Sequence, residues 1–212
     1  MSASATTRNL LAPVVRWGYR LRVHGAHRCP RCGPLLVVAP RLGFLDPTII
    51  ATCLLRPVDV LVDPGGLVAL GARIPGRIVV DQADPAGALR RARALLSARS
   101  AVGAWIGDGH ERAAGYLAVS CRPQVLPVAV FGGSGGHLGD PPRWRSMVDL
   151  VVGEPFDVPV PADPLARASA LQAAEFIRQR VADHATQAGV RLGRADGVGL
   201  EAQAGAPDNG PS

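Results

Sequence analysis

The sequence has no lysine, few aromatic residues and no long apolar run. All 23 of its Lys and Arg residues are arginine, and only 4% of its residues are aromatic. No stretch approaches the ~20 apolar residues that a membrane-spanning helix needs, so no such helix is expected. Because stacking aromatics are not interleaved with the basic residues, nucleic-acid binding is not expected either. Phosphate contacts would have to come from arginine side chains and backbone N–H groups.

The composition is otherwise that of a folded domain. Of the 212 residues, 48% are hydrophobic and 19% are charged, which is typical of a globular protein with one core. The net charge of +6 favours an anionic partner such as a membrane surface or a phosphorylated lipid. The first residues do not have a secretory-signal pattern. We therefore expect a cytoplasmic protein without disulfides, with peripheral contact to the inner face of the membrane as a further hypothesis.

The sequence predicts three parts. Residues 1–20 form a basic amphipathic segment, residues 21–188 form the folded domain, and residues 189–212, rich in Gly, Ala and Asp, form a disordered tail. The mixture of arginine and apolar residues over 8–23 has two interpretations. It suits a helix lying on a membrane surface, or a helix packed on its own domain with a basic outer face.

Apolar runs separated by turn residues predict that strands and helices alternate. Short β-branched runs predict strands over 35–39, 58–62, 77–80, 101–106, 125–131 and 147–152. Periodic patterns, with Asp-Pro starts at Asp46 and Asp84 as N-caps, predict helices over 46–55, 67–71, 85–99, 111–120 and 164–188. This order is typical of an α/β fold with a mainly parallel central sheet flanked by helices. Ligands on such sheets bind beyond the carboxyl ends of the strands, where the turns should meet.

Two cysteines in a short turn suggest a different kind of site. Cys29 and Cys32 form a Cys-x-x-Cys turn just after His24 and His27, and this pattern suits a small zinc-binding or redox-responsive protein. A structural zinc site, however, usually takes its second ligand pair from a distant segment. We therefore expect a surface turn that carries two thiols, and no metal site.

Four blocks follow one another in a fixed order over roughly residues 20–155. They are Arg41 to Asp46, Gly76-Arg77-Ile78-Val79-Val80-Asp81-Gln82, Trp105-Ile106-Gly107-Asp108-Gly109-His110-Glu111-Arg112, and Val125-Leu126-Pro127-Val128-Ala129. The ordered set resembles the glycerolipid acyltransferases, the lysophosphatidic acid (1-acylglycerol-3-phosphate) acyltransferase family. The resemblance implies a glycerol-3-phosphate-acyltransferase-like fold, acyl-CoA or acyl carrier protein as acyl donor, and no other cofactor.

The same resemblance gives roles to individual residues. Asp46 matches the family's Asp, which orients a catalytic His, but Arg41 stands where that His is expected. An imidazole can remove the proton of an attacking hydroxyl. A guanidinium stays protonated, so it can only pair with Asp46, bind an anion or stabilise an oxyanion. The first expectation is therefore a catalytically impaired, acyltransferase-like protein that binds an acyl thioester, a lysophospholipid or both.

Other positions in the blocks match residues that hold the acceptor's phosphate in the family. By resemblance, the substrate-binding positions are Arg77, Gln82, Asp108, Gly109 and Arg112. Gln82 stands where the family has Arg, so this position has lost its positive charge.

The alternative expectation is an active acyltransferase with a relocated base. His110 is the one histidine inside a block, and a folded-back loop could bring it near Asp46 to recreate a dyad. The simpler interpretations are an exposed loop histidine and an Asp46 that only caps its helix. The glycine-rich stretch 131–137 lacks the spacing of a known phosphate-binding loop. We expect a flexible loop after a strand there, with lining of the site through its N–H groups as an alternative.

Overall fold

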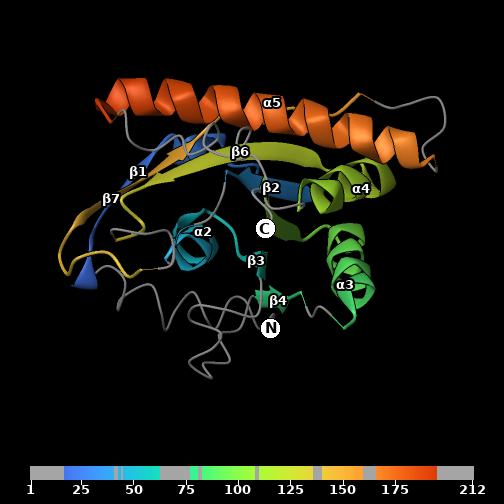
Figure 1. Cartoon of the computed structure of the whole chain (residues 1–212), viewed down its shortest axis with the longest axis horizontal. Coiled ribbons are helices and arrows are strands. Elements are labelled where there is room, and N and C mark those ends of the chain that lie inside the picture. Colours follow the sequence, from blue (N-terminus) through green and yellow to red (C-terminus); the bar gives the residue numbers. More distant parts are fainter. Residues whose placement is uncertain are drawn as a thin grey trace, which may run out of the picture.

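The computed structural model describes residues 17–40, 43, 45–62, 77–80, 83–107, 110–135, 140–159 and 166–194. In this part of the chain the centre is a seven-stranded sheet in the order β1-β7-β6-β2-β5-β3-β4 (Figure 1). The strands are β1 (Arg20–His24), β2 (Leu35–Ala39), β3 (Val58–Val62), β4 (Arg77–Val79), β5 (Ala101–Trp105), β6 (Gln124–Phe131) and β7 (Met147–Val152). Only β6 and β7 pair antiparallel. The expected α/β fold with a mainly parallel sheet is confirmed.

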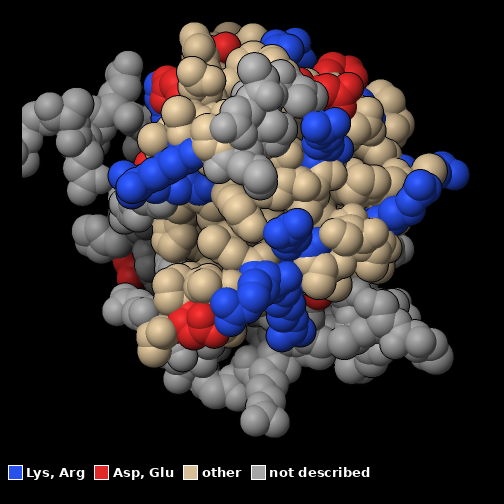
Figure 2. Space-filling view, turned by 90° about the vertical axis from the view of Figure 1, so that its right-hand side faces the viewer, with Lys and Arg blue, Asp and Glu red and all other residues tan. Residues whose placement is uncertain are grey.

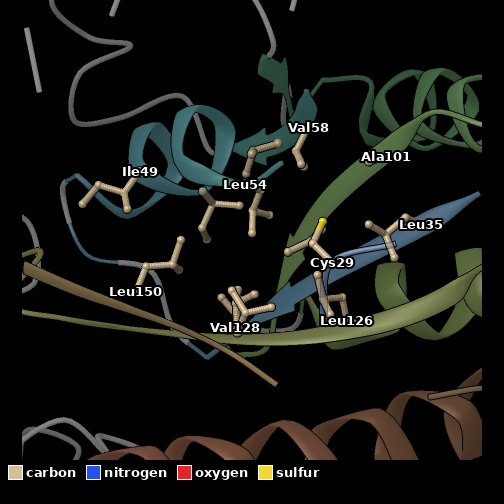
Figure 3. Close-up of a cluster of buried hydrophobic side chains, with 14 of the residues drawn as sticks. Cys29, Leu35, Ile49, Leu54, Val58, Ala101, Leu126, Val128 and Leu150 are labelled. Atoms are coloured by element: carbon tan, nitrogen blue, oxygen red, sulfur yellow. The ribbon is translucent and has the colours of Figure 1, made fainter. Parts of the chain in front are cut away.

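Helices cover both faces of the sheet. The described helices are η1 (Ala26–Arg28), α2 (Asp46–Cys53), α3 (Pro85–Ser97), α4 (Glu111–Cys121) and α5 (Arg167–Leu192). Apolar residues of α2 join the core cluster on one face (Figure 3), whereas α3, α4 and α5 contribute to the cluster on the other. Figure 1 shows α5 running along the sheet with α4 beside it.

Strand β2 is buried on both of its faces. Leu35, Val37 and Ala39 belong to the cluster that includes α2, and Leu36 and Val38 belong to the opposite cluster. A strand covered on both sides needs a continuous apolar run rather than an alternating one, which explains the sequence Leu-Leu-Val-Val-Ala. The central position of β2 places the turn that follows it in the middle of the sheet's edge.

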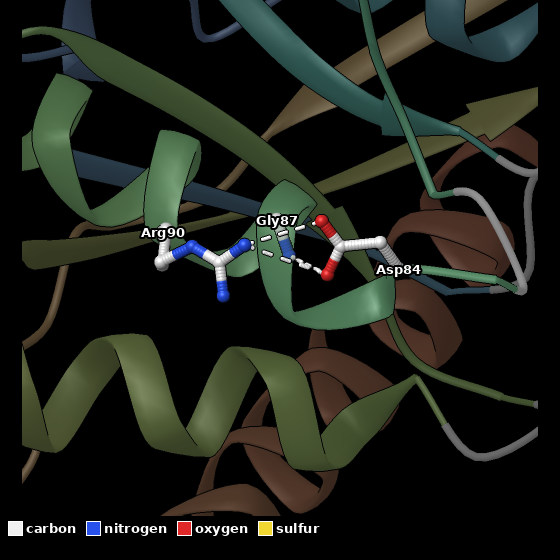
Figure 4. A network of polar contacts seen from close by, with 3 residues as sticks. All are labelled: Asp84, Gly87 and Arg90. Carbon is white, nitrogen blue, oxygen red and sulfur yellow. Dashed lines mark hydrogen bonds and ion pairs between the residues drawn. The ribbon is translucent and has the colours of Figure 1, made fainter.

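Helix α3 begins with the capping predicted from the sequence. The Gly87 N–H donates to Asp84 Oδ1 at 2.8 Å, and Pro85 occupies the first turn. Arg90 reaches back to the same carboxylate, with 3.1 Å between Nη2 and Oδ2 (Figure 4). Because this ion pair is largely exposed, it adds little stability, and the cap itself determines where the helix starts.

The outer face of α3 carries positive charge. Arg90, Arg91 and Arg93 are exposed there, and Figure 2 shows more basic than acidic side chains on this side of the molecule. Arg93 Nη1 also donates to Tyr116 Oη of α4 at 3.4 Å. The expectation that the α3 arginines lie outside the core is confirmed.

Two predicted boundaries are wrong. Arg20–His24 is a strand paired with β7, not part of a helix over 8–23. Leu21 and Val23 pack on the core, while Arg20 and Arg22, which alternate with them, face outward. Helix α5 continues past residue 188 to Leu192 and ends at Gly193, which has a left-handed φ of 63°. The predicted start of the tail at residue 189 is therefore too early in the sequence. Residues 1–16 and the helix expected over 67–71 lie outside the described residues.

Helices α4 and α5 approach each other closely at Gly115. A Cβ at this position would collide with the Ala170 carbonyl oxygen and lie 2.8 Å from Ala174 Cβ. A glycine is therefore required at the contact. Although α5 is long, none of the described helices is apolar over a stretch long enough to cross a bilayer.

Candidate functional site at the carboxyl edge of the sheet

The turns that carry the sequence blocks start from neighbouring strands. β2 and β5 are parallel with Ala39 opposite Trp105, and the Ile106 N–H donates to the Ala39 carbonyl at 2.9 Å. β6 lies parallel to β2 on its other side. The segments that follow β2, β5 and β6 therefore leave the sheet at the same edge, as expected for a ligand site on a parallel sheet.

Asp46 is a buried carboxyl at the start of α2. It is 5% exposed, and its Oδ2 accepts a hydrogen bond from the Gly43 N–H at 2.8 Å. Its Oδ1 has no hydrogen-bond partner among the described residues. Burial raises the pKa of Asp46 from its ordinary 3.8 to about 7, and the Gly43 N–H opposes this only partly. Buried polar atoms are rarely left unpaired, so Oδ1 is suited to meet a donor that is not part of the described chain.

The prediction that Asp46 caps α2 is wrong. Leu45 occupies the N-cap position, no side chain caps this helix, and Asp46 is its first residue. A capping carboxylate accepts N–H groups from the turn that follows it, whereas Asp46 turns back to Gly43. Helix capping therefore does not account for this aspartate.

The loop after β6 closes over Asp46. The Leu45 N–H donates to the Gly133 carbonyl at 3.1 Å. A Cβ built on Gly133 would overlap Asp46 Oδ1, and one built on Gly43 would overlap Ser134 Oγ. Both positions must be glycine for the turn and the loop to meet around the carboxyl. Gly133 and Ser134 of the glycine-rich stretch after β6 thus lie beside Asp46, whereas no pattern in the sequence indicated Gly43.

His110 lies at the beginning of α4, and its ring packs on Trp105 with 4.5 Å between centroids. These two residues line a cavity of about 250 Å³ between α3 and α4. The other lining residues are Leu61, Val80, Pro85, Ala88, Leu89, Ala104, Arg112 and Ala113. The lining is apolar except for His110 and Arg112, and Arg112 is exposed. Drug-sized ligands fill roughly 300–1,000 Å³, so this cavity suits one apolar end of a larger ligand.

The predicted site residues differ in what the structure shows of them. Asp46 contacts Gly43 and Gly133, whereas His110 packs on Trp105. Asp46 and His110 follow adjacent strands, but no contact between them is seen among the described residues. The Asp46–His110 dyad therefore stays a prediction. Positions 41, 82, 108 and 109 lie outside the described residues, as does the side chain at position 77.

The Cys-x-x-Cys turn does not bring its thiols together. Cys29 is 2% exposed within the core, and burial raises the pKa of its thiol, whereas Cys32 is exposed. His24 forms its hydrogen bond with Asp149, with 2.9 Å between Nε2 and Oδ1, and not with either cysteine. Within the described residues, no three His, Cys, Asp or Glu side chains are grouped to hold a metal ion.

The fold has a known counterpart. The chain is similar in structure to the 1-acyl-sn-glycerophosphate (LPA) acyltransferase PlsC from Thermotoga maritima. The TM-score is 0.55 at 17% sequence identity, and the match covers 85% of this chain and 78% of that one. At this identity the likeness establishes the shared fold. No protein-family model matches the sequence, and no curated protein matches it either.

Replacing Asp46 by Asn should make folding stability less dependent on pH. Because the pKa of Asp46 is about 7 in the folded protein and 3.8 ordinarily, the folded state keeps a proton between these values that the unfolded state has lost. Wild-type stability then falls as the pH rises through this window. We expect Asp46→Asn to raise the free energy of unfolding by roughly 2–4 kcal/mol at pH 8 and to have little effect at pH 4.

Urea unfolding at both pH values measures this difference. Asp183→Asn, which changes an exposed carboxylate on α5, is the matched control and should give the same small effect at both. An Asp46→Asn effect that does not change with pH would contradict a raised pKa.

Proposed function

We propose that this chain is an acyltransferase-like protein that binds an acyl thioester, a lysophospholipid or both at the carboxyl edge of its sheet. In this proposal Arg41 impairs the transfer chemistry. The observation that carries it is the buried Asp46 carboxyl, which has no capping role and has one oxygen without a partner among the described residues, at the edge where ligands bind. The fold shared with PlsC, which is named as an LPA acyltransferase, supports the same class of substrate.

The cavity between α3 and α4 is the proposed site for the acyl chain. Its apolar lining would remove methylene groups from water, and each buried methylene contributes about 0.8 kcal/mol. Arg112 and His110 are its polar members, so the thioester or phosphate end of the ligand would lie toward them. An exposed guanidinium such as that of Arg112 suits a phosphate because it donates several hydrogen bonds in a plane.

In this proposal Arg41 supplies a positive charge where a base is needed. Arginine does not deprotonate in proteins, so it cannot take the proton of the acceptor hydroxyl. It would still bind an anionic group or an oxyanion. Binding without turnover is the expected result.

The second candidate function is active acyl transfer with His110 as base, and its place in the wall of the cavity favours it. His110 would take the proton of an acceptor hydroxyl while the hydroxyl oxygen attacks the thioester carbonyl. The C–S bond then breaks, the acyl group stays on the acceptor oxygen, and the leaving thiolate receives the proton. The donor in either case would be acyl-coenzyme A or an acyl carrier protein, and a lipid acceptor would place the protein at the cytoplasmic surface of a membrane.

Acyl transfer from a labelled long-chain acyl-coenzyme A to lysophosphatidic acid separates the two candidates. If Arg41 is the only defect, we expect little turnover from the wild type. Arg41→His should then raise the rate at least tenfold, because a positioned base contributes about 10²–10⁴-fold. His27→Ala, at an exposed histidine outside the site, is the control. A wild type that turns over and loses this activity with His110→Ala would establish the second candidate instead.

Filling the cavity should block binding of the acyl chain. Ala88 is buried in the lining, whereas Ala86 is exposed on the same helix. We expect Ala88→Phe to weaken calorimetric binding of a long-chain thioether analogue of acyl-coenzyme A at least tenfold, and Ala86→Phe to leave it unchanged. Because overpacking costs about 1–3 kcal/mol of stability, both variants are first compared with the wild type by thermal unfolding. If the two folded variants bind the analogue with equal affinity, the acyl chain does not bind in this cavity.

A further inference from the structure

Two tryptophans lie side by side on the surface of a chain that has only three. Trp17 is 80% exposed and Trp144 is 60% exposed, and their rings meet edge to face with 5.6 Å between centroids. Tyr19 lies 6.0 Å from Trp144. We call these three residues the aromatic cluster. Tyr19 is half-buried against the core. Large aromatic side chains are normally buried for most of their area, so the exposure of Trp17 and Trp144 needs a reason.

The aromatic cluster is held in place by backbone contacts. The Arg145 N–H donates to the Gly18 carbonyl at 2.7 Å, and the Arg20 N–H donates to the Ser146 carbonyl at 3.0 Å. The Trp144 ring lies against Gly18, where a Cβ would be 3.0 Å from the ring. Arg145 has a φ of 62°, a left-handed conformation that costs a non-glycine residue energy. The fold therefore holds Trp144 in a strained turn and keeps it exposed.

The surroundings of the aromatic cluster are basic. Arg20, Arg22, Arg143 and Arg145 are all exposed. The two segments that carry them, 17–24 and 141–147, contain no Asp or Glu. Within the described residues, none of these arginines forms an ion pair. Exposed aromatic rings next to arginines without described ion pairs are complementary to a partner that has an anionic outer layer over an apolar interior.

The aromatic cluster also lies at the same edge of the sheet as Asp46. β7 runs antiparallel to β6, so its first residue, Met147, lies at the carboxyl end of β6. A Cβ on Gly132 would lie 2.5 Å from the Met147 carbonyl oxygen, and the next residue, Gly133, covers Asp46. The segment with Trp144 directly precedes Met147, and the segment with Trp17 directly precedes β1, which is parallel to β7. A partner that binds the aromatic cluster therefore lies next to the edge of the sheet that carries the candidate site.

We propose that Trp17, Tyr19 and Trp144, with Arg20, Arg22, Arg143 and Arg145, form a docking surface for an anionic lipid bilayer. Tryptophan and tyrosine favour the membrane–water interface because their rings are apolar and their N–H and O–H groups remain hydrated. The arginines bind the phosphates of anionic headgroups. Docking in this way turns the carboxyl edge toward the lipid. The proposal goes beyond the proposed function, because it holds whether or not the chain transfers acyl groups.

Binding of the full chain to vesicles tests this surface. Co-sedimentation with phosphatidylcholine vesicles is compared with and without phosphatidylglycerol. We expect binding to the anionic vesicles, and tryptophan emission that shifts to shorter wavelength because Trp17 and Trp144 leave water. Trp17→Ala/Trp144→Ala should reduce the partition coefficient at least tenfold. Arg20→Ala/Arg143→Ala should reduce binding to the anionic vesicles and make it less sensitive to salt.

The controls come from the opposite side of the sheet. Tyr116→Ala on α4 and Arg93→Ala on α3 change an exposed aromatic and an exposed arginine, and both should bind vesicles as the wild type does. The single variant Trp17→Ala is a second test in case the double variant misfolds, because a side chain as exposed as Trp17 contributes little to folding stability. Trp17→Ala/Trp144→Ala should bind a water-soluble, short-chain thioether analogue of acyl-coenzyme A with the affinity of the wild type, measured by calorimetry. This control shows whether the substitutions act on vesicle binding alone or also on the acyl site.

Three outcomes would overturn the proposal. One is equal sedimentation of the wild type and Trp17→Ala/Trp144→Ala with anionic vesicles. Another is a wild type that stays in the supernatant with both kinds of vesicle at low salt. The third is a concentration-dependent dimer without vesicles that Trp17→Ala/Trp144→Ala abolishes, which would assign the aromatic cluster to a second copy of the chain.

Discussion

The buried carboxyl of Asp46 is where three segments of the site meet. Gly43, in the turn after β2, donates to one of its oxygens, α2 starts at its backbone, and Gly133 covers the other oxygen. The glycines follow from this contact, because any side chain at either position would occupy space that the carboxyl or Ser134 already fills. Among the described residues Oδ1 of Asp46 has no partner, and a buried acceptor without a partner costs about 1–3 kcal/mol. Unfavourable features of this kind are typical of functional sites rather than of structural ones.

The edge of the sheet divides into a polar and an apolar side. Asp46 and the glycine loop lie beside the core cluster that contains Leu45 and Ile49 of the α2 side, whereas the cavity belongs to the cluster beneath α3 and α4. The strands that lead to the two sides, β2 and β5, are direct neighbours, whereas the two clusters lie on opposite faces of the sheet. A ligand that contacts both sides must therefore pass over the carboxyl edge, with its apolar part in the cavity and its polar part toward Asp46.

The sequence predicts best what depends on local pattern. The double burial of β2 follows from its unbroken apolar run, and the start of α3 follows from Asp84 and Pro85. Arg20–His24 lies in the stretch 8–23, whose mixture of arginine and apolar residues predicts a surface helix, although the alternation within Arg20–His24 is that of an edge strand. Asp46-Pro47 has the pattern of an N-cap, yet the carboxyl bonds to Gly43. Contacts between distant segments, such as Gly133 with Asp46 or Trp17 with Trp144, depend on strand register and have no local signal.

The most direct test of this account is a crystal structure of the protein with a long-chain thioether analogue of acyl-coenzyme A, which cannot react. We predict that the acyl chain lies in the cavity between α3 and α4, against Leu89 and Trp105, with the thioether sulfur on the side of His110 and Arg112. A chain bound on the α2 side of the sheet, or ligand bound elsewhere with the cavity empty, would contradict the account.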